Sequence, residues 1–329
     1  MRKLSVLIPT YNNADLLGDA IPPLLEDEAT GEVVVVVDGS RDGSIEILEE
    51  MAARDPRVRP FWTENRGKQA SRQHALDNAR NDVVLLMDAD VIAAPGLVSG
   101  HAAWHTDDVP RLVVGYMPCR VPPRRPGSFV IERYSDFYEE SCRAFAQDPG
   151  EILRRLWGGN VSAPKAKIQE AGGHAGGIPV GYTEDVELGL RLAGTGISPV
   201  FDKRLRAEHR AHKSLNGLVK SAHDYGEALV NLERAYPGRI YHPNWPDTGS
   251  GAALRRFTCR PRGLALVRRL GGPLLTWAGR LRMWQLESRI GAGLELVEIQ
   301  QGMIAASAAA PADGPARAPQ ADHALSTRR

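Results

Sequence analysis

Up to about residue 95 the chain alternates between short apolar segments and amphipathic ones, and this alternation constrains the fold more than any other feature. The apolar segments have the composition of buried strands and span Leu4 to Ile8, Glu32 to Val37, Arg57 to Trp62 and Val83 to Met87. Helices are predicted between them, over residues 14–27 (bent or shortened at Pro22-Pro23), after Ser44, and from Lys68 to about Ala79. Strand–helix alternation at this spacing favours right-handed βαβ crossovers. We therefore predict an α/β fold on a doubly wound, mostly parallel sheet.

Polar turns follow the first three predicted strands. Their sequences are Pro9-Thr10-Tyr11-Asn12-Asn13, Asp38-Gly39-Ser40-Arg41-Asp42-Gly43-Ser44 and Asn65-Arg66-Gly67-Lys68. The carboxyl ends of parallel strands lie along one edge of the sheet, and ligands of α/β proteins bind there. We expect the three turns to meet at that edge, and this convergence is a stronger signal than any one turn.

Two carboxylates, Asp88 and Asp90, come directly after the fourth apolar segment. Mg²⁺ and Mn²⁺ take oxygen ligands and commonly share phosphate oxygens with a substrate. An Asp-x-Asp at the end of a strand therefore suggests a metal–diphosphate site. Because Asp is also common in turns, an isolated pair is more often a plain turn, and only the flanking motifs favour the metal site here.

Composition excludes several classes of protein. At 329 residues the chain can bury a sizeable core, and its formal net charge of +1 gives no bulk attraction to nucleic acid. Three distant cysteines (Cys119, Cys142 and Cys259) show no metal-binding spacing and imply no disulfide framework, so a reducing cytoplasm is expected. We expect no signal peptide before the first strand. The sequence contains no apolar run of about 18 residues, so we expect no membrane-spanning helix.

The strand–helix rhythm loosens after residue 95. Strands are predicted over Leu112 to Cys119, after the Gly-rich turn at 157–162, over Pro199 to Asp202 and over Leu205 to Arg210. Helices are predicted over 128–147, over 183–192 with Thr183 as the N-cap, and near 214–236. The Gly-rich residues 172–181 are predicted to form a mobile loop.

The C-terminal part of the chain differs in charge. No acidic residue lies between Thr248 and Leu286, where eight arginines alternate with leucines and tryptophans. Such a segment is suited to an anionic membrane surface, while the alternative is a helical appendage whose arginines are merely solvated. We predict a catalytic domain over 1–215, a basic helical appendage over 216–306, with the membrane contact through 255–284, and a disordered tail over 307–329.

Six ordered motifs in the first 215 or so residues resemble those of family 2 glycosyltransferases, which have the GT-A fold. They are Ser5-Val6-Leu7-Ile8-Pro9-Thr10-Tyr11-Asn12, Val37-Asp38-Gly39-Ser40, Asn65-Arg66-Gly67-Lys68 through Arg72, Asp88-Ala89-Asp90, Gly158-Gly159-Asn160 and Thr183-Glu184-Asp185. The set is specific for the family and says little about the sugar. It implies a transferase that uses a nucleotide-diphosphate sugar, most often a UDP-sugar, and an acceptor hydroxyl on a saccharide or a lipid-linked molecule.

For the donor, the resemblance implies contacts from Pro9, Thr10, Tyr11 and Asp38 to the nucleoside. A carboxylate can accept the uracil N3–H, and an aromatic ring can lie against the base. Lys68 and Arg72 would lie near the diphosphate. The family usually has Asn after this arginine, whereas this chain has Gln73-His74.

For the metal, the resemblance implies Mn²⁺ or Mg²⁺ on Asp90, with Asp88 contacting the ribose, the sugar or a metal-bound water, or ligating the ion itself. A histidine after the catalytic helix often supplies a further ligand. Both His209 and His212 are candidates, and His209 fits the spacing slightly better. The alternative for either residue is an ordinary surface histidine.

For the chemistry, the resemblance implies that Asp185, in the pair Glu184-Asp185, is the base that deprotonates the acceptor, with inversion at the anomeric carbon. Acidic residues also stabilise a helix N-terminus without any catalytic role. Gly158, Gly159 and Asn160 would let the backbone approach the donor sugar.

The sequence can also be compared with the requirements of other functions. A nucleotidyltransferase would need a Gly-rich basic loop after the first strand, which Pro9 to Asn13 does not provide. A non-catalytic sugar-nucleotide or glycan-binding protein should have lost one of Asp88, Asp90 and Asp185. Processive synthases of the family carry a Gln/Arg-x-x-Arg-Trp motif, which Arg282-Met283-Trp284 does not match, so single addition is expected. The resemblance implies cell-envelope or secondary glycoconjugate biosynthesis, in the cytoplasm or at the inner face of the membrane.

Overall fold

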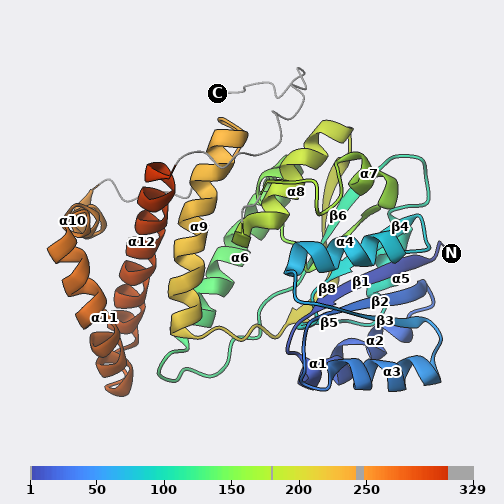
Figure 1. The fold of residues 1–329 in the computed structure, drawn as a ribbon, viewed down its shortest axis with the longest axis horizontal. Helices are drawn as coiled ribbons and strands as arrows, with labels where there is room; N and C mark the ends of the chain where they lie inside the picture. Colours follow the sequence, from blue (N-terminus) through green and yellow to red (C-terminus); the bar gives the residue numbers. More distant parts are fainter. Residues whose placement is uncertain (1, 179–180, 242–247, 310–329) are drawn as a thin grey trace.

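The computed structural model describes residues 2–178, 181–241 and 248–309, which form an α/β core with long helices along one side (Figure 1). Within these residues an eight-stranded sheet has the order β3-β2-β1-β4-β7-β6-β8-β5. Its strands are Leu4–Thr10 (β1), Thr30–Asp38 (β2), Val58–Thr63 (β3), Val83–Met87 (β4), Val91–Ala93 (β5), Arg111–Tyr116 (β6), Asn160–Pro164 (β7) and Ser198–His209 (β8).

The first half of the sheet is parallel, as predicted. β1 lies between β2 and β4, and β3 pairs with the far side of β2. Alternate residues of β2 enter two different apolar clusters: Val33, Val35 and Val37 one, and Val34 and Val36 the other. Because successive side chains of a strand point to opposite faces, both faces of this strand are buried, which explains its uninterrupted valine run.

Helices cover both faces of the sheet. They are Ala14–Ala20 (α1), Pro22–Leu25 (α2), Ser44–Arg54 (α3), Lys68–Asn78 (α4), Leu97–Ala103 (α5), Phe129–Gln147 (α6), Lys165–Glu170 (α7) and Glu184–Leu192 (α8), with 3₁₀ turns at Pro149–Arg154, Gly181–Thr183 and Ala193–Thr195. Side chains of α1, α2, α3 and α5 join one cluster, and those of α4, α7 and α8 join the other. The helix predicted over 14–27 is two helices, because Pro22 has no N–H to continue the first and begins the second.

The second half of the sheet is mixed. β7 is antiparallel to both β4 and β6, whereas β8 is parallel to β6 and antiparallel to β5. The separate strands predicted over Pro199 to Asp202 and Leu205 to Arg210 were wrong: they form one strand, β8, whose pairing with β6 shifts register. β5, α5 and α7 were not predicted. In the predicted Gly-rich loop, residues 172–175 form turns, residues 176–178 form neither helix nor strand, and residue 181 begins a 3₁₀ turn. Residues 179 and 180 lie outside the described part of the chain.

The remaining helices form the layer beside the core. They are Leu215–Ala235 (α9), Gly249–Thr258 (α10), Pro261–Arg280 (α11) and Trp284–Ala308 (α12). α9 and α12 approach closely where Gly226 faces Ile299. Glycine permits this approach, since a Cβ at Gly226 would lie 2.0 Å from the Ile299 carbonyl oxygen. α12 also contacts α6, and α11 packs on α12 at the outer end of the layer (Figure 1). Most of the predicted tail, residues 310–329, lies outside the described residues.

Candidate active site

The loops after β1 and β2 meet at the carboxyl edge of the sheet, as expected. The Asn12 amide donates to Ser40 Oγ at 2.8 Å, and the Ala14 amide donates to Asp42 Oδ2 at 3.0 Å. Thr10 is buried at the end of β1, and its hydroxyl has no hydrogen-bond partner among the described residues. Tyr11 is 52% exposed on the same loop, so its ring is accessible to a ligand.

Asp38 joins the second loop to the start of α4. One carboxylate oxygen accepts the Arg66 amide at 2.8 Å and the other accepts the Gly67 amide at 2.9 Å. Gly67 has a positive φ of 87°, which glycine adopts without strain. The buried carboxylate therefore holds the turn that places Lys68 and Arg72 at this edge.

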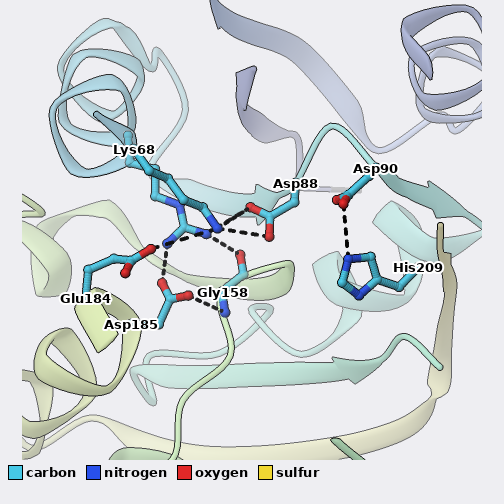
Figure 2. A network of polar contacts seen from close by, with 8 residues as sticks. Lys68, Asp88, Asp90, Gly158, Glu184, Asp185 and His209 are labelled. Carbon is cyan, nitrogen blue, oxygen red and sulfur yellow. Dashed lines mark hydrogen bonds and ion pairs between the residues drawn. The ribbon is translucent and has the colours of Figure 1, made fainter. Parts of the chain in front are cut away.

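Arg72 is the centre of an ion-pair network. Figure 2 shows the residues around it, among them Asp88, Gly158 and Asp185. Its guanidinium, 1% exposed, pairs with Asp185 and lies 3.0 Å from Asp88 Oδ1. It also donates to the Gly158 carbonyl at 3.2 Å. Lys68 Nζ lies 3.1 Å from Asp88 and 3.9 Å from Glu184. Residues from α4, the end of β4, the Gly-rich turn and the start of α8 thus meet at one point.

This network shifts the pKa values of its members. Burial disfavours the charged carboxylate of Asp88, but Lys68 and Arg72 hold its pKa well below the usual range. Burial likewise opposes the charge on Arg72, yet the surrounding carboxylates raise its pKa further above the ordinary value. Glu184 differs, because burial and the adjacent charge of Asp185 raise its pKa despite the nearby cations.

Gly158 and Gly159 leave room for these side chains. A Cβ at Gly158 would lie 2.4 Å from Asp185 Oδ1 and 2.6 Å from Arg72 Nη2. A Cβ at Gly159 would lie 2.8 Å from Met117 Sδ and 3.2 Å from Asp88 Oδ2. The Gly158 amide donates to Asp185 Oδ2 at 3.1 Å, so the backbone itself holds the carboxylate.

Asp90 lies beside His209, with 3.2 Å between Oδ2 and Nε2 (Figure 2). The antiparallel pairing of β5 and β8 sets His209 opposite Val91, one residue from Asp90, and so selects His209 over His212 as the neighbour. Burial opposes the charge on His209, but hydrogen bonds to Asp90 and Cys119 raise its pKa to about 10. Cys119 Sγ lies 3.8 Å from Nδ1, a neighbour that sequence reasoning missed.

The donor set at Asp90 is small. Among the residues that the structure describes, no group of three or more His, Cys, Asp or Glu side chains is arranged to hold a metal ion. Asp88 is bound by Lys68 and Arg72. One carboxylate and one imidazole nonetheless fit Mn²⁺ or Mg²⁺, which commonly retains waters and takes further oxygens from substrate phosphates.

Asn160 is turned into the protein interior by a network that the sequence did not predict. Its Nδ2 donates to the Leu205 carbonyl at 3.1 Å, so its Oδ1 must be the acceptor for His101 Nε2 at 2.8 Å. His101 Nδ1 then accepts from Ser162 Oγ, which accepts in turn from His105 Nε2. Burial lowers the pKa of both His101 and His105 to about 4, so both are neutral at pH 7.

Gln73, which follows Arg72 on α4, binds the Gly-rich segment after α7. Its Oε1 accepts the His174 amide at 2.7 Å and the Ala175 amide at 3.3 Å. Arg191 of α8 donates to the Gly173 carbonyl at 2.7 Å and pairs with the buried Glu187. This segment is therefore held from both α4 and α8, the helices that carry Arg72 and Asp185.

A cavity of about 510 Å³ adjoins Asp185 and extends between α6, α9 and α12. Apolar side chains form much of its wall: Phe137, Trp157, Val186, Leu218, Ala222, Leu229, Leu232, Ile240 and Ile299. Charged side chains also line it: Arg133, Arg154, Arg155, Lys213 and Glu295. Lys68, Asp88, Glu184 and Asp185 of the ion-pair network line the same cavity, so charged groups and an apolar wall face one space, which suits an amphiphilic ligand.

Comparisons with known proteins agree with this geometry. Residues 5–148 match the family model described as glycosyl transferase family 2. The chain is 30% identical over 334 aligned positions to validoxylamine A glucosyltransferase of Streptomyces hygroscopicus subsp. jinggangensis, covering 91% of this chain and 74% of that protein. It is 32% identical over 170 residues to the uncharacterized glycosyltransferase YfnE of Bacillus subtilis, a match that spans 51% of this chain but only 39% of YfnE.

A solved structure shares the fold. The mannosyltransferase PcManGT from Pyrobaculum calidifontis, in complex with GDP-Man and Mn²⁺, has a TM-score of 0.56 and 18% identity, covering 92% of this chain and 87% of that one. The fold predicted from the motifs is confirmed as GT-A. On the family model and the long alignment with a glucosyltransferase, this chain is a glycosyltransferase of family 2.

Proposed function

We propose that this glycosyltransferase moves a sugar from a nucleotide-diphosphate donor to an acceptor hydroxyl with inversion, and that a UDP-sugar is the first donor to test. The observation that carries the proposal is the shared guanidinium of Arg72, which joins Asp88 on the donor side to Asp185 on the acceptor side. A donor sugar placed at Gly158 and Gly159 would lie between these two carboxylates.

The donor side has groups for each part of the nucleotide. Three groups line the end of β1: the Thr10 hydroxyl, which has no partner within the described part of the chain, the backbone at Pro9 and the exposed ring of Tyr11. Asp38 uses one acceptor site of each oxygen for the Arg66 and Gly67 amides and retains others for a base N–H. Lys68 and Arg72 carry positive charge to the place that a diphosphate would occupy.

Asp90 and His209 would hold Mn²⁺ or Mg²⁺ together with phosphate oxygens, and Asp88 would complete the site through the ribose, the sugar or a metal-bound water. When bound, the ion neutralises charge that develops on the leaving diphosphate. The protein residues prepare for this, because His209 must lose its proton before it can act as a ligand.

Asp185 would act as the general base. The acceptor oxygen attacks the anomeric carbon from the side opposite the diphosphate, the bond from that carbon to the phosphate oxygen breaks, and Asp185 takes the hydroxyl proton. Each Asp185 oxygen already accepts one hydrogen bond, from Arg72 or from the Gly158 amide, and retains a lone pair for the acceptor. Glu184, whose pKa is raised, would assist at the same helix end.

The cavity beyond Asp185 would receive the acceptor. Its wall of apolar side chains from α6, α9 and α12 favours an acceptor with an apolar portion, such as a lipid-linked or alkyl-bearing saccharide. This suits a role in cell-envelope or secondary glycoconjugate biosynthesis on the cytoplasmic side of a membrane. Acceptor assays should therefore compare each sugar with its octyl glycoside.

Calorimetric titration tests the donor proposal directly. We expect UDP to bind in the presence of Mn²⁺, with GDP and dTDP as controls, and we expect binding to weaken without the ion and in Asp90→Ala. If the folded protein binds none of these nucleotides, with or without Mn²⁺, the nucleotide donor is wrong, and a polyprenyl-phosphate sugar becomes the donor to try. Once a donor is found, the proton coupling at the anomeric carbon of the product reports inversion or retention.

A further inference from the structure

The α11 helix exposes its large apolar side chains. Leu266, Leu270, Leu274, Trp277 and Leu281 follow one another at intervals of three or four residues along and just beyond the helix. On a helix of 3.6 residues per turn this spacing forms one stripe. Each of the five side chains is between 44% and 55% exposed. We call these residues the α11 stripe.

Packing within the protein does not account for the α11 stripe, because other residues form the buried face of α11: Gly263, Gly271, Leu275, Ala278 and Gly279. A Cβ at Gly271 would lie 2.4 Å from Leu294 Cδ2, and a Cβ at Gly279 would lie 2.6 Å from Glu287 Oε1. Ala278 is fully buried on the same side. The helix therefore packs inward through these small residues and the buried Leu275, and it leaves the five side chains of the α11 stripe exposed, at the outer end of the helical layer (Figure 1).

Arginines lie along one edge of the α11 stripe. Arg262 and Arg269 are about two helical turns apart, and Arg269 and Arg280 about three. The three arginines therefore share one side of the helix, and all are exposed. Arg268 differs, because it turns toward α12 and pairs with Glu298 at 2.7 Å. No acidic residue occurs between Thr248 and Leu286 to balance these charges.

We infer that the α11 stripe docks on an anionic membrane surface. Leucine and tryptophan would enter the boundary between headgroups and acyl chains, while the arginine edge contacts lipid phosphates. The helix would lie in the plane of the membrane, and within the described residues no helix is both long and apolar enough to cross it. The same face of a second copy of the chain fits less well. It would bring further arginines to the contact, and the segment between Thr248 and Leu286 has no acidic residue to pair with them.

This surface is linked to the cavity through α12, which packs on α11 and contributes Glu295 and Ile299 to the cavity wall. Docking would thus hold the acceptor side of the enzyme at a fixed orientation to the bilayer. The inference does not depend on the donor or the acceptor proposed above, because its test measures vesicle binding and not transfer.

Vesicle flotation with the full chain tests the inference. We expect binding to vesicles of phosphatidylglycerol and phosphatidylcholine, and little binding to phosphatidylcholine alone. Leu270→Glu/Trp277→Glu should abolish binding, whereas the control Val109→Glu, which places a charge at another exposed apolar residue, should not. Removing Arg262, Arg269 and Arg280 together by substitution with Ser should lower vesicle affinity about a hundredfold, since each contributes about fivefold near an anionic surface.

A matched charge control removes three exposed charges from the surface of the α/β core, through Arg54→Ser/Arg80→Ser/Arg143→Ser. This variant should keep most of the vesicle binding. Circular dichroism establishes that each variant is folded. Failure of the wild-type protein to bind anionic vesicles overturns the inference, as does equal loss in the two arginine triples. A wild-type dimer that Leu270→Glu/Trp277→Glu converts to monomer would instead make this face an interface between copies.

Discussion

The guanidinium of Arg72, on the helix after β3, is paired with the carboxylate of Asp185 at the start of α8, 113 residues later in the chain. The same guanidinium contacts Asp88 at the end of β4. One buried cation thus sets the separation of two carboxylates to which the family motifs give different tasks.

Replacing Arg72 with Met should destabilise the protein by about 3 kcal/mol, because loss of one partner leaves buried carboxylates uncompensated. It should also abolish transfer. Urea denaturation at pH 7 measures the free energy of unfolding, with Arg54→Met, at an exposed ion pair with Glu50, as the control. An unchanged free energy of unfolding in Arg72→Met would contradict the structural role given to this residue.

Asp185→Asn should lower the turnover number at least a thousandfold while leaving the dissociation constant for nucleotide within about threefold, because an amide cannot take the acceptor proton. Glu184→Gln should have the smaller effect on turnover. Initial rates and calorimetry on both variants measure the two quantities. The opposite ranking, with turnover retained in Asp185→Asn and lost in Glu184→Gln, would transfer the base to Glu184.

His209→Ala should weaken Mn²⁺ binding about a hundredfold, since even residues that only support a metal ligand typically contribute 10–100-fold. His212→Ala is the control and should bind Mn²⁺ normally. Because Asp90 and Cys119 hold a proton on His209, wild-type affinity for Mn²⁺ should rise with pH, and loading should release a proton. Calorimetric titrations in buffers of different ionisation enthalpy measure that proton release. Equal Mn²⁺ affinities in His209→Ala and His212→Ala would exclude His209 as a ligand.

Gly158→Ala should abolish transfer, because its Cβ would lie 2.4 Å from Asp185 Oδ1 and 2.6 Å from Arg72 Nη2. Gly18→Ala in α1 is a matched control, because none of the described residues lies within 4 Å of the new Cβ. It should leave activity unchanged and stabilise the protein by about 0.5–1 kcal/mol, as Ala does in helices. Initial rates and denaturation curves of the pair measure both effects, and full activity in Gly158→Ala would argue against a tight network at this turn.

Acid should destabilise the protein between about pH 6.5 and 4 through His101 and His105. Burial lowers the pKa of both histidines to about 4 in the folded protein. As the pH falls, the unfolded chain therefore binds a proton at each histidine before the folded protein does. Their contribution to stability is therefore complete above about pH 6.5 and is lost as the pH falls toward 4, with a slope of about 2–3 kcal/mol per pH unit for the two groups.

His105→Gln keeps a donor toward Ser162 but cannot titrate, so it should remove about half of this slope. His212→Gln is the control and should leave the slope as in wild type. Denaturant titrations at pH 7, 6, 5 and 4.5 measure the free energy of unfolding for all three proteins. Parallel curves for wild type and His105→Gln would mean that the histidine network does not cause the acid sensitivity.

The amino-acid sequence by itself determined the local features of this protein. The valine run of β2, the apolar segment before Asp88 and the break at Pro22 follow from side-chain burial and backbone chemistry within a few residues. The motif order also identified the family and the edge of the sheet that carries the site. These inferences succeeded because periodicity, turn chemistry and the helix-breaking effect of proline act over short stretches of chain.

Only the tertiary structure decided which distant residues meet. The register of β5 on β8 put His209, and not His212, beside Asp90. The antiparallel placement of β7 turned Asn160 toward His101, and the glycine contacts between α11 and α12 left the α11 stripe outside. Each outcome depends on strand register or helix packing, which are set by many contacts between segments far apart in sequence and leave no local pattern to read.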